Sequence, residues 1–170
     1  LIDSGGHYKY GTTDISRTLS VGTPSAEMIK NYTLVLKAHI ALADAKFNYL
    51  TSGKDLDQIA RAKLKNYGFD YNHGTGHGVG SVLSVHEGPL SISPNYINSG
   101  FEPGMIFSNE PGIYIENKFG IRIENIMLVC NDENIQETKS LYFDILSFVP
   151  FEKALIKREL LDPEEIIWIN

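Results

Sequence analysis

Glycine occupies every second position from Gly74 to Gly80, in the segment His73-Gly74-Thr75-Gly76-His77-Gly78-Val79-Gly80. Each glycine weakens a helix by about 1 kcal/mol relative to alanine, so this alternation strongly disfavours a helix. In an extended segment successive side chains point to opposite faces, and one face here carries no side chains at all. The pattern therefore predicts an extended segment that another backbone or a substrate can approach closely.

Two aspartates flank a predicted chain reversal near the start of the sequence. Asp3 and Asp14 lie symmetrically about Tyr8-Lys9, in a glycine-rich run between two β-leaning segments, Leu1-Asp3 and Thr12-Ser20. Antiparallel pairing about this reversal would place the two carboxylates opposite each other. Directly opposite residues on one face have Cβ atoms about 5 Å apart, a separation at which two carboxylates can share cations.

Two glutamates repeat this arrangement later in the chain. Glu110 and Glu124 lie symmetrically about Asn117, a residue type that favours turns. The flanking segments, Met105-Ile115 and Phe119-Cys130, are rich in β-branched and aromatic residues. A second hairpin is therefore expected to bring Glu110 and Glu124 together.

Four carboxylates in one place would repel one another and raise some of their own pKa values. Two divalent cations would balance that charge. Ligands that are mostly oxygen with one imidazole, from His77, suit hard or borderline ions, so we expect two Mn²⁺, with Co²⁺ or Zn²⁺ as alternatives. Two such ions about 3.5 to 4 Å apart can bridge a water, lower its pKa and polarise a carbonyl, which predicts a hydrolase.

Three of the five histidines, His73, His77 and His86, fall within fourteen positions. With the four acids, they lie in motifs that resemble the metal-dependent aminopeptidases of the pita-bread fold, and within that family aminopeptidase P (Xaa-Pro aminopeptidase). The segments that carry the resemblance are Leu1-Ile2-Asp3-Ser4-Gly5, Gly11-Thr12-Thr13-Asp14-Ile15-Ser16-Arg17-Thr18, Gly74-Thr75-Gly76-His77-Gly78-Val79-Gly80, Val85-His86-Glu87-Gly88-Pro89, Asn109-Glu110-Pro111-Gly112 and Gly120-Ile121-Arg122-Ile123-Glu124-Asn125.

The resemblance implies a role for each site residue. The implied metal ligands are Asp3, Asp14, His77, Glu110 and Glu124. Asp14 and Glu124 would bridge the two ions, and Glu110 would also act as a catalytic proton shuttle. It further implies that His73 and His86 contact the substrate and stabilise the tetrahedral intermediate, and that Arg122 orients carboxylates.

The implied activity is that of a metal-dependent exopeptidase, which releases the N-terminal residue from peptides with proline in second position. It would use a hydroxide bridged by two divalent metal ions. The implied fold is α+β, a curved and mostly antiparallel sheet with two covering helices. The implied partners are the peptide substrate and a second copy of the chain in a homodimer.

The family's catalytic domain has about a hundred residues before the first aspartate, and this chain begins two residues before Asp3. We therefore expect residues 1–170 to form a single partial catalytic domain, roughly the second half of the pita-bread fold. All five expected ligands lie within it. Such a half is expected to expose a strand edge and apolar surface, which leaves its activity and its stability in isolation open.

Composition bears on the binding partners and the cellular compartment of the protein. The net charge of -6 argues against nucleic acid or an anionic membrane as a partner. Cys130 is the single cysteine, which fits a reducing, cytoplasmic compartment. No run approaches the roughly 18 apolar residues of a membrane span.

Periodicity predicts the remaining elements. Apolar residues at helical spacing favour helices over about Ser25-Leu50 and Asp55-Tyr67. The polar, proline-containing stretch Ser91-Pro103 is expected to be a loop near the site. Leu141-Val149 and Ala154-Lys157 are predicted to be closing strands.

Other functions remain open from sequence. Prolidase and methionine aminopeptidase are the nearer enzymatic alternatives, and a non-catalytic pita-bread module that binds peptides or proteins is the alternative of another class. His39 lies on the first predicted helix and is expected to be structural. His7 lies in the first turn and is expected to be solvated.

Overall fold

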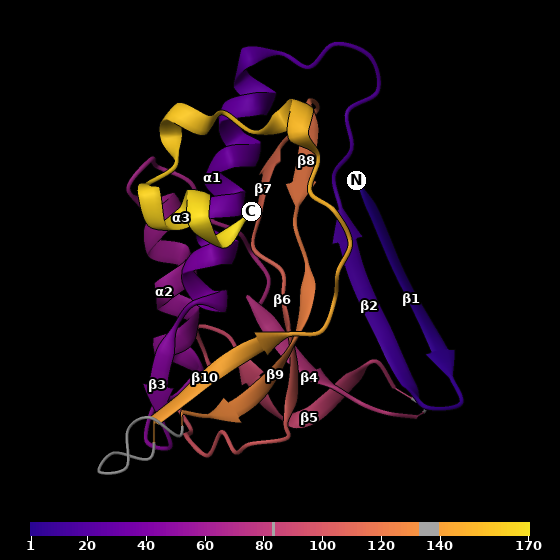
Figure 1. Ribbon diagram of the computed structural model, residues 1–170, viewed down its shortest axis with the longest axis vertical. Helices are drawn as coiled ribbons and strands as arrows, with labels where there is room; N and C mark the ends of the chain where they lie inside the picture. Colours follow the sequence, from indigo (N-terminus) through magenta and orange to yellow (C-terminus); the bar gives the residue numbers. More distant parts are fainter. Residues whose placement is uncertain (83, 133–139) are drawn as a thin grey trace.

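The computed structural model describes residues 1–82, 84–132 and 140–170, arranged as an α+β fold (Figure 1). The helices are α1 (Ala26–Ala43), α2 (Gly53–Lys65) and α3 (Pro163–Trp168), with two short 3₁₀ helices, η1 (Lys153–Leu155) and η2 (Arg158–Leu160). The strands are β1 (Ile2–Tyr8), β2 (Gly11–Arg17), β3 (Lys46–Asn48), β4 (Gly76–Val79), β5 (His86–Ile92), β6 (Ile106–Asn109), β7 (Gly112–Ile115), β8 (Phe119–Arg122), β9 (Asn125–Asn131) and β10 (Ser140–Ile145).

The strands form three antiparallel sheets. The largest has the order β3-β10-β9-β6-β4-β5, and β1-β2 and β7-β8 form two-stranded ribbons. The β7–β8 ribbon continues the β6–β9 pair along α1, while the β1–β2 hairpin lies on the other side of that ribbon (Figure 1). The α+β class expected from sequence is therefore confirmed.

The β6–β9 and β7–β8 pairs share one register across a break. Asn109 faces Asn125 on one side of the break, and Gly112 faces Arg122 on the other. Counting inward from either side places Glu110 opposite Glu124. The ribbon turns at Asn117, whose φ of 58° is left-handed, so the reversal expected from the spacing of the two glutamates is confirmed.

The first hairpin forms, but its predicted register is wrong. Asp3 pairs with Ser16, and Asp14 pairs with Gly5, because the chain reverses between Tyr8 and Gly11 instead of at Tyr8-Lys9. A shift of one residue in the turn moves the pairing by two. Asp3 and Asp14 are therefore diagonal neighbours on one face of the hairpin, so they remain close without being directly opposite.

The glycine-alternating segment packs as tightly as its composition predicts. Its strand, β4, lies between β5 and β6. A Cβ atom on Gly76 would lie 2.0 Å from the backbone oxygen of Ser108, and one on Gly78 would lie 2.3 Å from that of Glu87. The bare glycine face is thus occupied by the backbones of the neighbouring strands.

The first predicted helix is too long. Ser25 caps α1 by accepting a hydrogen bond from the Met28 N–H, but α1 ends at Ala43, and the chain continues as β3. Phe47 is the reason, because it is buried in the sheet with its ring centroid 4.7 Å from that of Phe143. Tertiary packing here overrides a helical spacing that extends through Phe47.

The second helix is confirmed with a shift of two residues. Ser52 and Asp55 form a capping box, so α2 begins at Gly53 and not at Asp55. It ends at Lys65, and Gly68 follows with a left-handed φ of 79°. Helices α1 and α2 pack against each other and enclose the core with the six-stranded sheet.

Two predictions near the C-terminus need correction. Residues 154–157 do not form a strand, because the Glu152 side chain accepts a hydrogen bond from the Ala154 N–H and starts η1. Thr33 Oγ1 of α1 accepts from the Lys157 N–H and holds this segment against the helix. The strand predicted over 141–149 is β10, which ends at Ile145.

The loop predicted over 91–103 is shorter than expected at its start, because β5 continues through Ile92. That strand was not predicted, and it carries His86 at its first position. Among the described residues, no helix combines the length and the apolar character that crossing a bilayer requires.

The close packing of β4 gives a testable expectation for stability. Gly76→Ala should lower the free energy of unfolding by about 1–3 kcal/mol, since the added methyl group meets a backbone oxygen that no side-chain rotation can move. Gly88→Ala is the matched control, because a Cβ atom there meets nothing within 4 Å. Urea unfolding of the metal-free protein measures both, and equal stabilities would contradict the packing argument.

Candidate metal centre

Four segments bring the acidic side chains into one place. Asp3 and Asp14 come from β1 and β2, while Glu110 and Glu124 come from the break between the β6–β9 and β7–β8 pairs. Glu124 is buried with 2% exposure and Asp14 with 8%, whereas the Asp3 side chain is about half exposed. The cluster therefore reaches from the protein interior to its surface.

The ligand atoms fall into two overlapping groups, each within 4.8 Å of one another. One group is Asp3, Asp14 and Glu124, and the other is His77, Glu110 and Glu124. Glu124 belongs to both. The structure thus brings together all five residues expected to bind metal, with one carboxylate shared between two sets of three.

His77 is oriented for a cation. Its Nδ1 atom lies 2.9 Å from the backbone oxygen of Gly78, a contact that requires Nδ1 to carry the hydrogen. Nε2 then faces carboxylate oxygens, 3.4 Å from Glu110 Oε1 and 3.5 Å from Asp14 Oδ2. If the ring were neutral, the lone pair of Nε2 would face two negatively charged carboxylates. A proton or a metal ion at Nε2 resolves the conflict.

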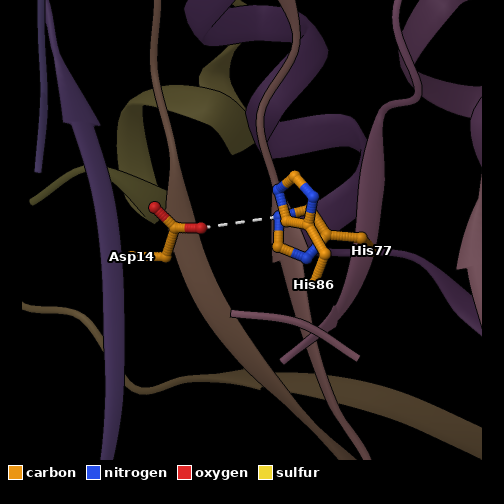
Figure 2. A group of neighbouring side chains, drawn as sticks. All are labelled: Asp14, His77 and His86. Carbon is orange, nitrogen blue, oxygen red and sulfur yellow. Dashed lines mark ion pairs between the residues drawn. The ribbon is translucent and has the colours of Figure 1, made fainter. Parts of the chain in front are cut away.

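His86 lies directly beside the expected ligands and belongs to a possible ligand group of its own. Its ring centroid is 4.0 Å from that of His77, and the ligand atoms of Asp14, His77 and His86 form a third group within 4.8 Å. Figure 2 shows the two rings side by side, facing the Asp14 carboxylate. His86 comes from the start of β5, so its position depends on the β4–β5 pairing.

Burial and neighbouring carboxylates both raise the pKa values of the two glutamates. Burial raises the pKa of Glu124 to about 8, and the neighbouring Glu110 carboxylate adds to the increase. Burial also raises the pKa of Glu110, against the lowering effects of His77 and Arg122. The pKa of His77 is raised as well, because hydrogen bonding and attraction to Asp14 and Glu110 outweigh its desolvation. Without cations, the centre therefore holds protons near neutral pH.

Two serines orient the buried glutamates. Ser16 Oγ donates to Glu124 Oε2 at 2.7 Å, and Ser108 Oγ donates to Glu110 Oε1 at 3.2 Å. Ser16 Oγ in turn accepts from Arg122 Nε at 3.0 Å. Neither serine was predicted from the sequence as a site residue. Their positions two residues after Asp14 and two before Glu110, on the same strand face, were the available signal.

Arg122 connects the rim of the cluster to His73. It forms an ion pair with Asp3 and donates from Nη1 to the Tyr114 hydroxyl at 3.0 Å. That hydroxyl lies 2.8 Å from His73 Nε2. Since His73 Nδ1 bonds the Gly74 carbonyl, Nε2 is the acceptor and Tyr114 the donor. Arg122 thus contacts a carboxylate, and Tyr114, which was not predicted from the sequence, joins it to His73.

A buried network fixes the segment that leads into β4. Arg61 donates to Asp57 Oδ2 at 2.7 Å and to the His73 carbonyl at 2.5 Å. Thr75 Oγ1 donates to Asp57 Oδ1 at 2.6 Å, and the Thr75 carbonyl accepts from the Glu110 N–H at 2.8 Å. Helix α2 therefore positions both His73 and Glu110 through this network.

The two remaining histidines lie outside the cluster. His39 is fully buried on α1, where its Nδ1 lies 3.2 Å from the Asn109 carbonyl, and burial lowers its pKa to about 3. His7 is exposed on β1 and bonds Thr12 Oγ1 at 2.9 Å. Neither side chain belongs to the groups that could hold an ion.

The donor set fits a pair of divalent cations. It offers carboxylate oxygens and imidazole nitrogens without a thiolate, a combination that suits hard or borderline ions. It also carries raised carboxylate pKa values that such ions would lower.

Comparison with known proteins identifies the family. A model of metallopeptidase family M24 matches residues 1–131. The chain belongs to metallopeptidase family M24. Within this family it is 46% identical, over its whole length, to Xaa-Pro aminopeptidase 1 of Dictyostelium discoideum and to aminopeptidase P1 of Arabidopsis thaliana. It spans 28% and 27% of those two proteins, so just over a quarter of the relatives' length.

Solved M24 structures share the fold. The X-prolyl aminopeptidase from Caenorhabditis elegans, a cytosolic enzyme with a di-nuclear active site, superposes with a TM-score of 0.92 at 42% identity. That match covers 98% of this chain and 27% of the other. Prolidase from Pyrococcus furiosus superposes with a TM-score of 0.71 at 34% identity, over 86% of this chain and 40% of the other. The expected pita-bread architecture and the resemblance to aminopeptidase P are confirmed.

The raised pKa values predict how stability depends on pH without metal. Glu124 ionises near pH 8 in the folded protein and near 4.5 when unfolded, so between pH 6.5 and 8 the folded state binds more protons. Stability should therefore fall as pH rises through this window, with a contribution from Glu124 of up to about 1.4 kcal/mol per pH unit. The raised pKa of His77 acts in the same direction.

Glu124→Gln should flatten this slope, because glutamine has no proton to lose. Chemical unfolding with a chelator present, at several pH values from 6.5 to 8, measures the difference between the two proteins. Glu116→Gln changes an exposed glutamate and is the matched control. Parallel pH profiles for wild type and Glu124→Gln would show that Glu124 does not titrate abnormally.

Proposed function

We propose that this chain carries the catalytic centre of an Xaa-Pro aminopeptidase that works with two divalent metal ions. The observation that carries the proposal is the shared position of Glu124, which belongs to two different groups of donors whose ligand atoms lie within 4.8 Å of one another. A single carboxylate that joins Asp3 and Asp14 to His77 and Glu110 suits two adjacent ions better than one. The dinuclear centre of the C. elegans relative supports this interpretation.

The proposed division of labour follows the positions of the side chains. Asp3, Asp14, His77, Glu110 and Glu124 would hold the ions, which when bound lower the pKa of a water and polarise the scissile carbonyl. Glu110 lies among the expected ligands, with Oε1 3.4 Å from His77 Nε2, so its carboxylate would be placed to accept a proton from the attacking water and return it to the departing amine.

The surrounding residues would bind and orient the substrate. His86, exposed at the start of β5, is placed to donate to the oxygen that becomes negatively charged as the peptide carbonyl is attacked. His73 is held by Tyr114, and Tyr114 by Arg122, so these three side chains form one connected wall. Arg122 also holds the exposed Asp3 carboxylate in place.

The substrate class is proposed from the relatives. Three of the M24 relatives described above are named Xaa-Pro aminopeptidase, aminopeptidase P or X-prolyl aminopeptidase. Proline lacks an amide N–H, so enzymes that hold peptides as β-strands bind Xaa-Pro sequences poorly, and a dedicated site is needed. Prolidase remains the nearest enzymatic alternative, because prolidases share the fold at 34% identity. Methionine aminopeptidase and a non-catalytic peptide-binding module remain further alternatives.

Metal identity, compartment and assembly complete the proposal. Mn²⁺ is the ion that the oxygen-rich donor set favours, ahead of Co²⁺ or Zn²⁺. A cytoplasmic setting is consistent with a single cysteine, Cys130, and with the cytosolic C. elegans relative. A homodimer is proposed from the family resemblance alone.

The proton-transfer role of Glu110 can be tested directly. In the full-length enzyme, Glu110→Gln should lower turnover per bound ion by at least about 100-fold, since glutamine cannot accept the proton, while binding of an Arg-Pro-Pro peptide should remain. Steady-state kinetics, calorimetry of peptide binding and metal analysis together separate loss of chemistry from loss of ions. Glu116→Gln, at an exposed position, should behave as wild type. Retained turnover in Glu110→Gln would remove Glu110 from this role.

A substrate panel separates the enzymatic alternatives. An Xaa-Pro aminopeptidase should cleave Arg-Pro-Pro after its first residue, whereas a prolidase should favour Xaa-Pro dipeptides and a methionine aminopeptidase Met-Ala peptides. Mass spectrometry of the products, with Mn²⁺ supplied, gives the order of preference. No cleavage of any substrate by the full-length protein with two ions bound would favour the non-catalytic alternative.

A further inference from the structure

Arg17 is a buried cation at the end of β2, and every N–H of its guanidinium is engaged. Nη1 donates to the carbonyls of Ser16, at 2.9 Å, and Glu124, at 2.6 Å. Nη2 donates to Asn125 Oδ1 and to the Val149 carbonyl, both at 2.6 Å. Nε donates to the Pro150 carbonyl at 3.2 Å. Residue 17 as a whole is 5% exposed.

These contacts are unusual for a buried arginine, because each partner is a neutral oxygen. Burial lowers the pKa of Arg17, which shows that desolvation is the largest influence on its charge. The Phe151 ring lies against the guanidinium, with its centroid 4.9 Å from Cζ. A planar group with five donors is needed to hold so many separate acceptors, and lysine cannot replace that geometry.

The Glu124 backbone depends on this arrangement. Glu124 lies in the break between β8 and β9, where it has no ladder partner. Its N–H donates to the Ser16 carbonyl at 3.0 Å, and its carbonyl accepts from Arg17 Nη1. Both backbone groups of the shared carboxylate residue are therefore held by the last two residues of β2.

We propose that Arg17 is a positioning residue of the metal centre: it fixes the Glu124 backbone and anchors it to residues 149–151. The inference rests on the proposed dinuclear function. Arg17 itself touches neither the expected ligand atoms nor the substrate. Its effect passes through the backbone at position 124, which sets where the shared carboxylate points.

The test measures Mn²⁺ binding to the metal-free purified protein by calorimetry, together with thermal unfolding in chelator. Arg17→Lys and Arg17→Gln should each weaken Mn²⁺ affinity by about 10- to 100-fold, the range found when groups that support metal ligands are changed. Because lysine keeps the positive charge but lacks the planar guanidinium, Arg17→Lys should bind Mn²⁺ nearly as weakly as Arg17→Gln.

Lys37→Gln is the matched control for stability. Lys37 is also a buried cation, but it pairs with Asp162 and Glu165, where α1 meets α3. Its loss should lower the unfolding temperature and leave Mn²⁺ affinity unchanged. A purely structural Arg17 would behave in the same way. Unaltered affinity in folded Arg17→Lys would therefore overturn the proposal.

A milder variant keeps the test decisive if both Arg17 variants fail to fold. Phe151→Leu removes the ring beside the guanidinium and leaves β2 and β9 unchanged, so it should weaken Mn²⁺ binding several-fold. Wild-type affinity in folded Phe151→Leu would then overturn the role of Arg17. Fewer than two ions bound by wild type at saturation would instead refute the dinuclear function, so the two failures are distinguishable.

Discussion

Repulsion among four carboxylates is the constraint around which this centre is built. Asp3, Asp14, Glu110 and Glu124 gather in one place, and burial together with the neighbouring Glu110 carboxylate raises the pKa of Glu124 to about 8. The fold holds them there through hydroxyl donors and Arg122. The stability that opposes this repulsion comes from the core between α1, α2 and the sheet, which contains none of these charges. Bound cations would relieve the repulsion and make the protein more stable.

Much of this centre follows from spacing alone. Glu110 and Glu124 are equidistant from Asn117, and a turn there fixes one register for the whole ribbon, so their pairing could be predicted without any packing information. The Asp3–Asp14 register was mispredicted because the glycine-rich run allows the reversal at more than one place. Asp14 and Asp3 still share a face, since the error was an even number of residues. Side chains alternate between the two faces of a strand, and an error of one residue in the turn changes the register by two. The predicted face of each residue is therefore unchanged.

The features that escaped prediction depend on long-range contacts. Tyr114 joins His73 to Arg122 only because β7 folds beside the end of the glycine segment. Phe47 leaves the helical pattern because β10 supplies a partner for it nearly a hundred residues later. Arg17 was noticed only within a family motif, since its acceptors at 124, 125, 149 and 150 are invisible in the local sequence. Local propensity carries no signal for such contacts.

The outward-facing backbone groups of the central ribbon explain why four segments converge. Val129 donates to Met105, and Ile123 donates to Pro111, so in this antiparallel register Glu110 and Glu124 fall between hydrogen-bonded pairs and their backbone groups point away from each other. The Glu110 N–H donates to Thr75, two residues before His77, and the Glu124 N–H donates to Ser16, two residues after Asp14. Each glutamate is therefore bonded through its backbone to the strand that carries another expected ligand. The position of the two glutamates between hydrogen-bonded pairs thus directs their backbone groups to the neighbouring segments, and these bonds help to assemble the donors.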